Sequence, residues 1–155
     1  MGLFSKKIEV VAPMSGELID ITQVEDITFS QKMLGDGVAI VPVNGKLVSP
    51  VDGKIIQVFH TKHAIGVDLS GVEILIHVGM NTVELQGEGF TAHVKEGDKV
   101  SKGDLMLEVD LALLREKGYP TETPIVITNM EIVKNLDKKL GTVVAGQDVI
   151  MELKK

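Results

Sequence analysis

The fold is decided by the stretch His63-Ala-Ile-Gly-Val-Asp-Leu-Ser-Gly-Val-Glu-Ile-Leu-Ile-His77. Two short apolar segments flank Leu69-Ser70-Gly71, and a three-residue loop that ends on a left-handed glycine commonly joins the strands of a β-hairpin. Pairing about this loop places His63 opposite His77 and Ile65 opposite Leu75. A bulge at the glycine shifts the pairing by one residue, so two registers remain open.

The hairpin brings two imidazole rings to one surface of a pair of strands, above an apolar floor of Ile65 and Leu75. A single buried histidine is more often a hydrogen-bonded core residue than a functional one. A cross-strand pair is different, because charging both rings costs free energy through repulsion and desolvation. The pair therefore stays at least partly neutral near pH 7, and an unprotonated ring nitrogen is then available as a nucleophile or a metal ligand.

Length and composition limit the class of protein. The 155 residues suit one domain with a sizeable core, which we expect over 8–155 after a flexible end at 1–7. The absence of cysteine excludes a disulfide framework, a thiolate nucleophile and the commonest structural zinc sites. With 22 acidic and 16 basic residues the net charge is −6, which argues against non-specific binding to nucleic acid. No apolar run approaches the roughly 18–20 residues of a membrane-spanning helix.

The 16 glycines, scattered at short intervals among segments rich in valine and isoleucine, predict an all-β fold, an antiparallel β-sandwich or barrel. The expected strands are 8–11, 16–21, 38–42, 53–59, 63–67, 72–78, 104–109, 124–128, 141–144 and 148–153. Helical signals are few and short. Asp110 is a suitable N-cap for a helix over 111–117 that stops at Gly118, and Asn129 for one over 130–136. Residues 30–34 form at most one or two turns.

The sequence also repeats itself. Ala12-Pro-Met-Ser-Gly-Glu-Leu-Ile-Asp-Ile21 matches Ser49-Pro-Val-Asp-Gly-Lys-Ile-Ile-Gln-Val58, and each is a Pro-x-x-Gly turn that leads into an alternating strand. A second echo pairs Val94–Val100 with Val143–Val149, which share the pattern Val-x-x-Gly-x-x-Val. Glycine turns between valine-rich strands also look alike without any relation. Two copies of a turn-and-strand unit predict an internal pseudo-repeat, with pseudo-symmetric sheets packed on each other.

Six motifs follow one another along the chain: Gly35-Asp-Gly37, Ser49-Pro-Val-Asp-Gly53, Thr61-Lys-His63, Gly71-Val-Glu-Ile-Leu-Ile-His-Val-Gly79, Thr82-Val-Glu-Leu85 and Gly87-Glu-Gly-Phe90. In this combination the chain resembles, from about Ile8 to Leu153, the glucose-family enzyme IIA of the bacterial phosphoenolpyruvate-dependent sugar phosphotransferase system. The resemblance implies a compact antiparallel β-sandwich and a monomeric cytoplasmic phosphocarrier without a cofactor. Such a carrier accepts a phosphoryl group from the histidine-containing phosphocarrier protein and passes it to the IIB domain of a sugar permease.

The resemblance also implies roles for the residues that match the family's motifs. His77 corresponds to the histidine that takes the phosphoryl group on Nε2, and His63 corresponds to the supporting histidine. Thr61 matches the threonine that orients the supporting ring, and Gly79 matches the residue whose carbonyl fixes the tautomer of the phosphorylated ring. The family surrounds this pair with an apolar collar that binds partners, although core packing accounts for some of its members: Ile27, Phe29, Met33, Leu34, Phe59, Ile65 and Leu75.

Asn81 departs from the family's pattern, because many relatives carry an aspartate at this point after the His-x-Gly motif. Asparagine keeps the hydrogen bonding but removes a negative charge close to an incoming phosphate. We therefore expect an altered partner docking or transfer rate with an unchanged type of reaction. His60 and His93 are weaker candidates, which we expect at solvated or edge positions.

Three other classes of function stay open. A biotinyl or lipoyl carrier domain also uses Pro-x-x-Gly turns, yet it commonly needs a lysine within Met-Lys-Met or Asp-Lys-Ala, and neither tripeptide occurs. A zinc hydrolase would need ligands such as His60, His63 and His77, but His-x-x-His on a strand sends its two rings to opposite faces. A regulatory module agrees with the resemblance, since relatives dock on other proteins and in some complexes hold zinc with the two histidines and a partner's carboxylate. Two histidines alone leave a zinc site incomplete, so we predict no tight metal binding by the isolated chain.

Overall fold

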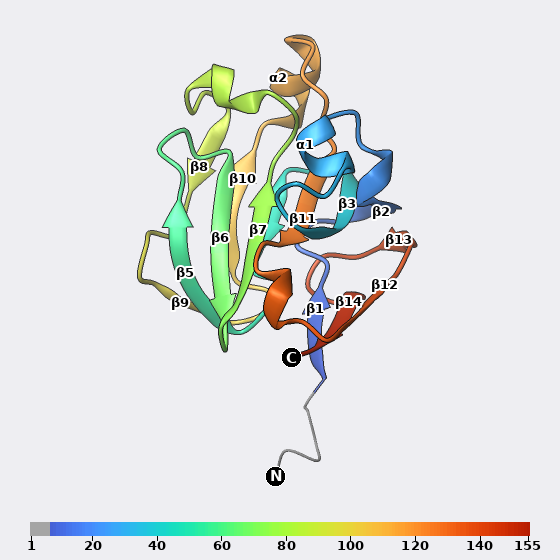
Figure 1. Cartoon of the computed structure of the whole chain (residues 1–155). Helices are drawn as coiled ribbons and strands as arrows, with labels where there is room; N and C mark the ends of the chain where they lie inside the picture. Colours follow the sequence, from blue (N-terminus) through green and yellow to red (C-terminus); the bar gives the residue numbers. More distant parts are fainter. Residues whose placement is uncertain (1–6) are drawn as a thin grey trace.

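The structure is a computed structural model and describes residues 7–155 (Figure 1). The strands within these residues are β1 (Ile8–Val11), β2 (Gly16–Asp20), β3 (Asp36–Pro42), β4 (Lys46–Val48), β5 (Gly53–Val58), β6 (Ala64–Leu69), β7 (Val72–His77), β8 (Phe90–Ala92), β9 (Lys99–Val100), β10 (Leu105–Val109), β11 (Thr123–Ile127), β12 (Asn135–Lys138), β13 (Gly141–Val143) and β14 (Val149–Lys154). The α-helices are α1 (Ile27–Ser30) and α2 (Leu111–Glu116), and the 3₁₀ helices are η1 (Ile21–Gln23), η2 (Thr82–Leu85) and η3 (Met130–Ile132).

All paired strands run antiparallel, in three sheets. The largest sheet has the order β13-β2-β3-β11-β7-β6-β5-β9, and the two three-stranded sheets are β1-β14-β12 and β4-β10-β8. Figure 1 shows β8 and β10 behind the β5-β6-β7 part of the large sheet. One apolar cluster joins these layers, with Ile65 and Ile76 from the large sheet and Leu47 and Met106 from the β4-β10-β8 sheet, all fully buried. The predicted antiparallel β-sandwich with a few short helices is confirmed.

The β6–β7 hairpin adopts the second of the two registers. Ile65 pairs with Ile76, so the loop consists of Ser70 and Gly71 alone. Both residues are left-handed, with φ of +51° and +90°, as a type I′ turn requires. The one-residue shift sends Leu75 to the face opposite Ile65. The expected floor of Ile65 and Leu75 is therefore wrong, because Ile65 lies in the central cluster and Leu75 packs on the outer face of the sheet.

All ten expected strands are present, with ends that move by no more than two residues. The sequence analysis missed four short strands, β4, β8, β9 and β12. The helix expected over 111–117 is α2, and the Asp110 carboxylate caps it by accepting the N–H of Leu113 at 3.0 Å. The turn expected over 30–34 begins earlier, as α1.

The helix expected over 130–136 is wrong beyond Ile132, because only η3 forms and the chain then enters β12. Asn129 makes no side-chain cap there. Its side chain accepts the N–H of Glu73 at 2.9 Å and donates to the carbonyl of Gly71 at 2.6 Å. A polar side chain that bonds a distant backbone in this way competes with the local helix.

The first sequence echo corresponds to a pseudo-twofold pattern of backbone hydrogen bonds. The N–H of Val11 donates to the carbonyl of Pro50 at 3.0 Å, and the N–H of Val48 donates to that of Pro13 at 2.8 Å. Val11 is equivalent to Val48 in the two repeats, and Pro13 is equivalent to Pro50, so the two hydrogen bonds are the same bond with the repeats exchanged. The predicted internal repeat is thus visible in how the two Pro-x-x-Gly segments pair.

The second echo has a different structural counterpart. In the first repeat Ala12 accepts a hydrogen bond from the N–H of Gly146, and in the second repeat Ser49 accepts one from the N–H of Gly103. Gly97, the match suggested by the sequence, donates to Ile55 instead. The valine-glycine pattern alone therefore paired the wrong turns.

Of the flexible end expected over 1–7, the structure describes only Lys7, whose ammonium lies 2.7 Å from Glu152 of β14. Residues 1–6 lie outside the described residues, so that expectation stays a prediction. In the described part of the chain, no helix combines the length and the apolar character needed to cross a membrane.

Candidate functional site

His77 is the last residue of β7, and its half-buried ring lies at one end of the large sheet. The ring Nδ1 is 2.8 Å from the carbonyl oxygen of Gly79. A carbonyl can only accept, so Nδ1 carries the hydrogen and donates it. The neutral ring then has an unprotonated Nε2, which is the atom free to act as a nucleophile or ligand.

Gly79 can hold this carbonyl in place because of its backbone conformation. Its φ is +73°, and a Cβ atom there would lie 2.7 Å from Cγ2 of Thr82 and 2.8 Å from the carbonyl oxygen of Pro120. The flanking loop is fixed by two further bonds: the Thr82 hydroxyl donates to the carbonyl of Val78, and the N–H of Met80 donates to Pro120 at 3.1 Å. The position therefore requires glycine for steric reasons as well as for its φ.

His63 lies next to His77, with ring centroids 4.8 Å apart and an interplanar angle of 83°. It precedes β6 and follows Lys62, whose φ is +61°, so strand alternation does not set the direction of its ring. Its Nδ1 is hydrogen-bonded to the hydroxyl of Thr61. The side chain is only 4% exposed. The two histidines thus meet although the hairpin register differs from the one that first paired them.

Burial and the neighbouring ring keep these histidines uncharged at neutral pH. Burial, together with the smaller effect of the neighbouring His77 ring, lowers the pKa of His63 to about 4. Burial also lowers the pKa of His77, against the opposing effects of the Gly79 carbonyl and the Asp26 carboxylate. The arrangement therefore presents a neutral imidazole pair, with one Nε2 lone pair fixed by the tautomer of His77.

Two aromatic rings flank the pair. Phe29 of α1 meets the His77 ring edge to face, with centroids 5.1 Å apart, and Phe59 meets the His63 ring in the same way at 5.5 Å. Asp26 caps α1 by accepting the N–H of Thr28 at 2.8 Å. The sequence analysis missed Asp26 as a residue that acts on His77. The sequence offered Asp26 only as a suitable N-cap residue, and no local pattern placed its carboxylate near His77.

The other expected collar residues differ in their exposure to solvent. Ile27, Met33 and Leu34 are 62%, 68% and 40% exposed, and all three come from the segment between β2 and β3. Leu75 is partly buried on the outer face and packs with the cluster that contains Phe29. Ile65 does not belong to a surface collar, because the register shift buries it completely in the central core.

Asn81 is exposed and left-handed, with φ of +60° and ψ of +15°, and its side chain makes no capping hydrogen bond to η2. Asparagine is one of the few non-glycine residues that tolerate this conformation well. His60 and His93 are exposed, as expected, and His93 lies 3.2 Å from Glu108. Over residues 7–155 no group of three or more histidine, cysteine, aspartate or glutamate side chains is placed to hold a metal ion.

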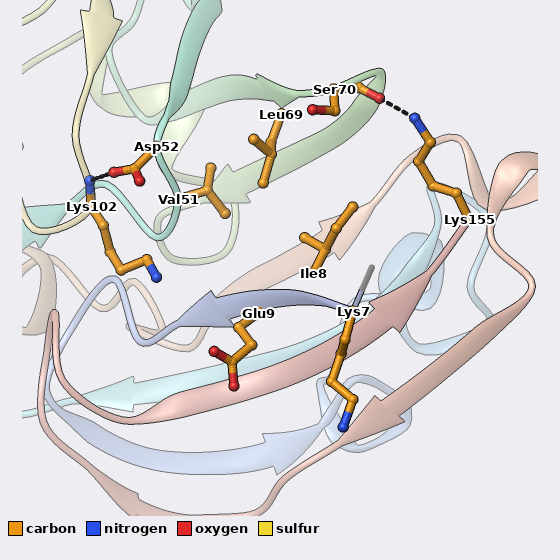
Figure 2. Close-up of a pocket in the computed structure, with 9 residues that line it drawn as sticks. All are labelled: Lys7, Ile8, Glu9, Val51, Asp52, Leu69, Ser70, Lys102 and Lys155. Atoms are coloured by element: carbon orange, nitrogen blue, oxygen red, sulfur yellow. Dashed lines mark hydrogen bonds between the residues drawn. The ribbon is translucent and has the colours of Figure 1, made fainter. Parts of the chain in front are cut away.

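A separate hollow of about 570 Å³ lies at the other end of the β6–β7 hairpin (Figure 2). The residues around it are Lys7, Ile8, Glu9, Val51, Asp52, Leu69, Ser70, Lys102 and Lys155. Ser70 belongs to the turn of the hairpin, whereas His77 ends β7, so the hollow and the histidine pair are distinct. Two of its lysines are already engaged, Lys155 with the Ser70 carbonyl at 2.6 Å and Lys7 with Glu152.

Comparisons with known proteins show what this chain is similar to. Residues 8–133 match the family described as phosphoenolpyruvate-dependent sugar phosphotransferase system, EIIA 1. A glucose-specific EIIA component of the phosphotransferase system from Haemophilus influenzae is 46% identical, over all of both chains. The component of the same name from Bacillus anthracis is 50% identical, over 98% of this chain and 94% of that protein. Among solved structures, glucose permease IIA from Mycoplasma capricolum superposes with a TM-score of 0.89 at 40% identity, over 94% of this chain and 96% of the other.

Proposed function

Because the chain belongs to the EIIA 1 family of the phosphoenolpyruvate-dependent sugar phosphotransferase system, we propose that it carries a phosphoryl group on Nε2 of His77. One observation carries the choice of atom. The Nδ1 hydrogen of His77 is donated to the Gly79 carbonyl, so the lone pair of the neutral ring is on Nε2. The role of a phosphoryl carrier follows from the family, and the residues below are our assignment within it.

The proposed first step is a transfer between two histidines. The Nε2 lone pair of His77 attacks the phosphorus of the phosphorylated donor, the histidine-containing phosphocarrier protein. The phosphorus–nitrogen bond of the donor breaks, and the donor imidazole keeps the electron pair and takes up a proton. The reverse chemistry with the IIB domain of a sugar permease then frees His77. Each step replaces the bond between phosphorus and the leaving nucleophile with a bond to the incoming nucleophile, and no water takes part, so the transfer potential is kept.

His63 is assigned the supporting role. Its ring lies against that of His77, and if the Thr61 hydroxyl donates to Nδ1, its hydrogen is on Nε2. That N–H can stabilise the oxygens of the transferring phosphoryl group.

The proposed docking surface consists of Ile27, Met33 and Leu34 around the edge of the histidine pair. Exposed apolar side chains next to a reactive nitrogen fit a site that excludes water only when a partner covers it. The same surface serves donor and acceptor, because both must reach the one Nε2. The sugar need not touch this chain. We propose that the carrier is a monomer. We place it in the cytoplasm, because its phosphorylated donor is made there.

Single-turnover phosphorylation tests this assignment. Incubation with phosphoenolpyruvate and the two general phosphotransferase proteins should add one acid-labile, base-stable phosphoryl group, detected by mass. His77→Gln should accept none. His63→Gln should accept a detectable amount, because an amide N–H replaces one donor, but should pass it to the IIB domain slowly. Label on His77→Gln but not on His63→Gln would reverse the two roles, and label on a hydroxyl residue would overturn the proposal.

A further inference from the structure

Between β2 and β3 the chain leaves the large sheet, and this excursion from Ile21 to Gly35 contains η1 and α1. The excursion carries the exposed docking residues and the Phe29 ring that contacts His77. It is attached to the sheet by a small apolar cluster, in which Ile21, Val24 and Phe29 pack on sheet residues. A helix of one turn has no stability of its own, so its position depends on such attachments.

A single ammonium group joins the two ends of the excursion. Nζ of Lys138 lies 2.6 Å from Oδ1 of Asp20, the last residue of β2, and 2.9 Å from Oδ1 of Asp36, the first residue of β3. Lys138 itself comes from β12, which belongs to a different sheet. The contact therefore links β2, β3 and β12 at the neck of the excursion, the place where the chain leaves the large sheet and rejoins it.

The remaining oxygens of both carboxylates are also used inside the excursion. Oδ2 of Asp20 accepts the N–H of Thr22 at 3.1 Å and its hydroxyl at 2.6 Å, which caps η1. Oδ2 of Asp36 lies 3.7 Å from Nζ of Lys32. The network thus extends from the neck to residues on both sides of α1.

The three side chains are largely shielded from water, with exposed fractions of 21% for Lys138, 28% for Asp20 and 22% for Asp36. Burial raises the pKa of Asp20, but hydrogen bonds from Lys138 and Thr22 outweigh it and bring the pKa to about 2. The ammonium of Lys138 is likewise held in its charged form by its two carboxylates, which raise its pKa against the effect of burial. Without the cation, two neighbouring carboxylates would repel each other across the neck.

We propose that Lys138 is a positioning residue for phosphoryl transfer: it clamps the ends of the 21–35 excursion and so holds the docking surface beside His77. This inference rests on the proposed function, because it assigns the excursion to partner binding. Lys138 lies outside the reacting atoms and acts through Asp20 and Asp36 alone. Its loss should therefore impair the encounter with partners and leave the chemistry at His77 intact.

The test compares Lys138→Met, which removes the cation, with Lys138→Arg, which keeps it. Lys139→Met is the matched control, since the neighbouring ammonium is half exposed and pairs with Glu152 at 3.5 Å rather than with the excursion. Amide hydrogen exchange over 27–31 should be at least about tenfold faster in Lys138→Met, while exchange over 72–77 stays unchanged. Lys138→Arg and Lys139→Met should both exchange like the wild type.

Steady-state phosphorylation by the donor protein provides the second readout. The KM for the donor should rise about fivefold in Lys138→Met, with the rate at saturating donor within about twofold of wild type, and Lys138→Arg should restore most of the affinity. Asp36→Asn, which leaves the Lys138–Asp20 pair, serves as a milder variant if Lys138→Met does not fold.

The outcomes separate the clamp from the function. Unchanged exchange over 27–31 overturns the clamp, and so does a uniform rise in exchange over every strand. Faster local exchange with an unchanged KM overturns the link to docking. A wild-type chain that accepts no phosphoryl group refutes the proposed function, while the exchange data still judge the clamp.

Discussion

At the scale of single residues, His63 and His77 differ in what holds Nδ1. The carbonyl of Gly79 can only accept, so it fixes the tautomer of His77, whereas the hydroxyl of Thr61 can donate or accept and permits either tautomer of His63. Both rings stay neutral because they are removed from water. The protein thus presents one defined lone pair and one adaptable partner, which is the physical basis for naming His77 the nucleophile.

The depressed pKa of His63 predicts a loss of stability in mild acid. The unfolded chain takes up a proton on this ring near its ordinary pKa of 6.5, whereas the folded chain does so only near pH 4. Between these values the unfolded state binds more protons, so the free energy of unfolding falls as the pH falls. The contribution of His63 should be complete above about pH 6.5 and lost by pH 4, and it should amount to about 2–3 kcal/mol.

Urea unfolding at pH 7, 6, 5 and 4 measures this effect as the difference between wild type and His63→Gln. The variant lacks the titrating ring, so its stability should fall less steeply over the same range, although other carboxylates titrate in both proteins. The ring signals of His63 in an NMR titration should move near pH 4. Parallel stability profiles for the two proteins would show that the ring titrates normally.

Gly79→Ala should disturb the carbonyl that orients His77. The new Cβ meets Thr82 and Pro120 below 3 Å at a φ of +73°, so the loop must shift at a cost of about 1–3 kcal/mol. We expect slower phosphorylation of His77 together with this loss of stability. Gly118→Ala is the matched control, because Gly118 has a φ of +83° but nothing within 4 Å of its Cβ position.

Gly118→Ala should therefore carry the backbone strain alone and leave phosphorylation unchanged. Rates are measured under single-turnover conditions, and stabilities by urea unfolding. If both variants accept the phosphoryl group equally fast, the Gly79 carbonyl does not govern the reactivity of His77.

At the scale of elements, the turn between β6 and β7 sets which residues face the core. A two-residue loop needs positive φ at both positions, and Gly71 satisfies this without cost while Ser70 does not. A three-residue loop would have moved every side chain of one strand to the other face. The turn therefore decides the burial of Ile65 and, with it, which residues remain at the surface near the histidines.

Substitution of Ser70 should change stability through this backbone conformation alone. Ser70→Asn should stabilise the fold by up to about 1 kcal/mol, and Ser70→Val should destabilise it by about 1–2 kcal/mol, because a left-handed conformation is unfavourable for a β-branched residue. The same two changes at Ser101, an exposed serine without a positive φ, should have little effect. Urea unfolding of the four variants gives the comparison, and a destabilised Ser70→Asn would contradict the type I′ assignment.

At the scale of the whole molecule, a protein of net charge −6 carries exposed apolar residues on the same segment that places Phe29 against His77. The proposed function implies that long-range attraction to a basic donor steers the encounter and that apolar contacts hold the complex. The rate of association should therefore fall as salt rises. The affinity of the docked complex should depend on Ile27, Met33 and Leu34.

Met33→Lys tests the placement of the docking surface. A charge in place of an apolar residue that is 68% exposed leaves the core intact but must be desolvated when a partner binds. We expect the KM for the donor to rise at least about fivefold, or about 1 kcal/mol, with the acceptor reaction affected alike. Leu140→Lys is the control, since Leu140 is 65% exposed and lies next to β13, at the far edge of the large sheet. Equal KM values for the two variants would show that the surface lies elsewhere.

The sequence by itself determined the elements whose pattern is local. Apolar runs between turn residues mark ten of the fourteen described strands, and Asp110 and Gly118 mark the limits of α2. The sequence also brings His63 and His77 to the same end of the hairpin, because a short loop joins the two segments, but the contact between their rings depends on the backbone outside β6. The motifs around His63 and His77 carried the resemblance to the enzyme IIA family.

Only the tertiary structure decided the features that depend on distant partners. β9 has two residues and β12 has Leu136 as its one apolar residue, so neither shows an apolar pattern, and both are specified by the strands they pair with. The hairpin register depended on whether Ser70 accepts a left-handed φ, which packing of the two faces settles. Lys138 contacts Asp20 and Asp36 only because three strands from two sheets converge. The side chain of Asn129 donates a hydrogen bond to Gly71 in the β6–β7 turn instead of capping a helix. These features depend on contacts between residues far apart in the sequence. The free energy of such contacts comes from burial in the folded chain, which local sequence patterns do not show.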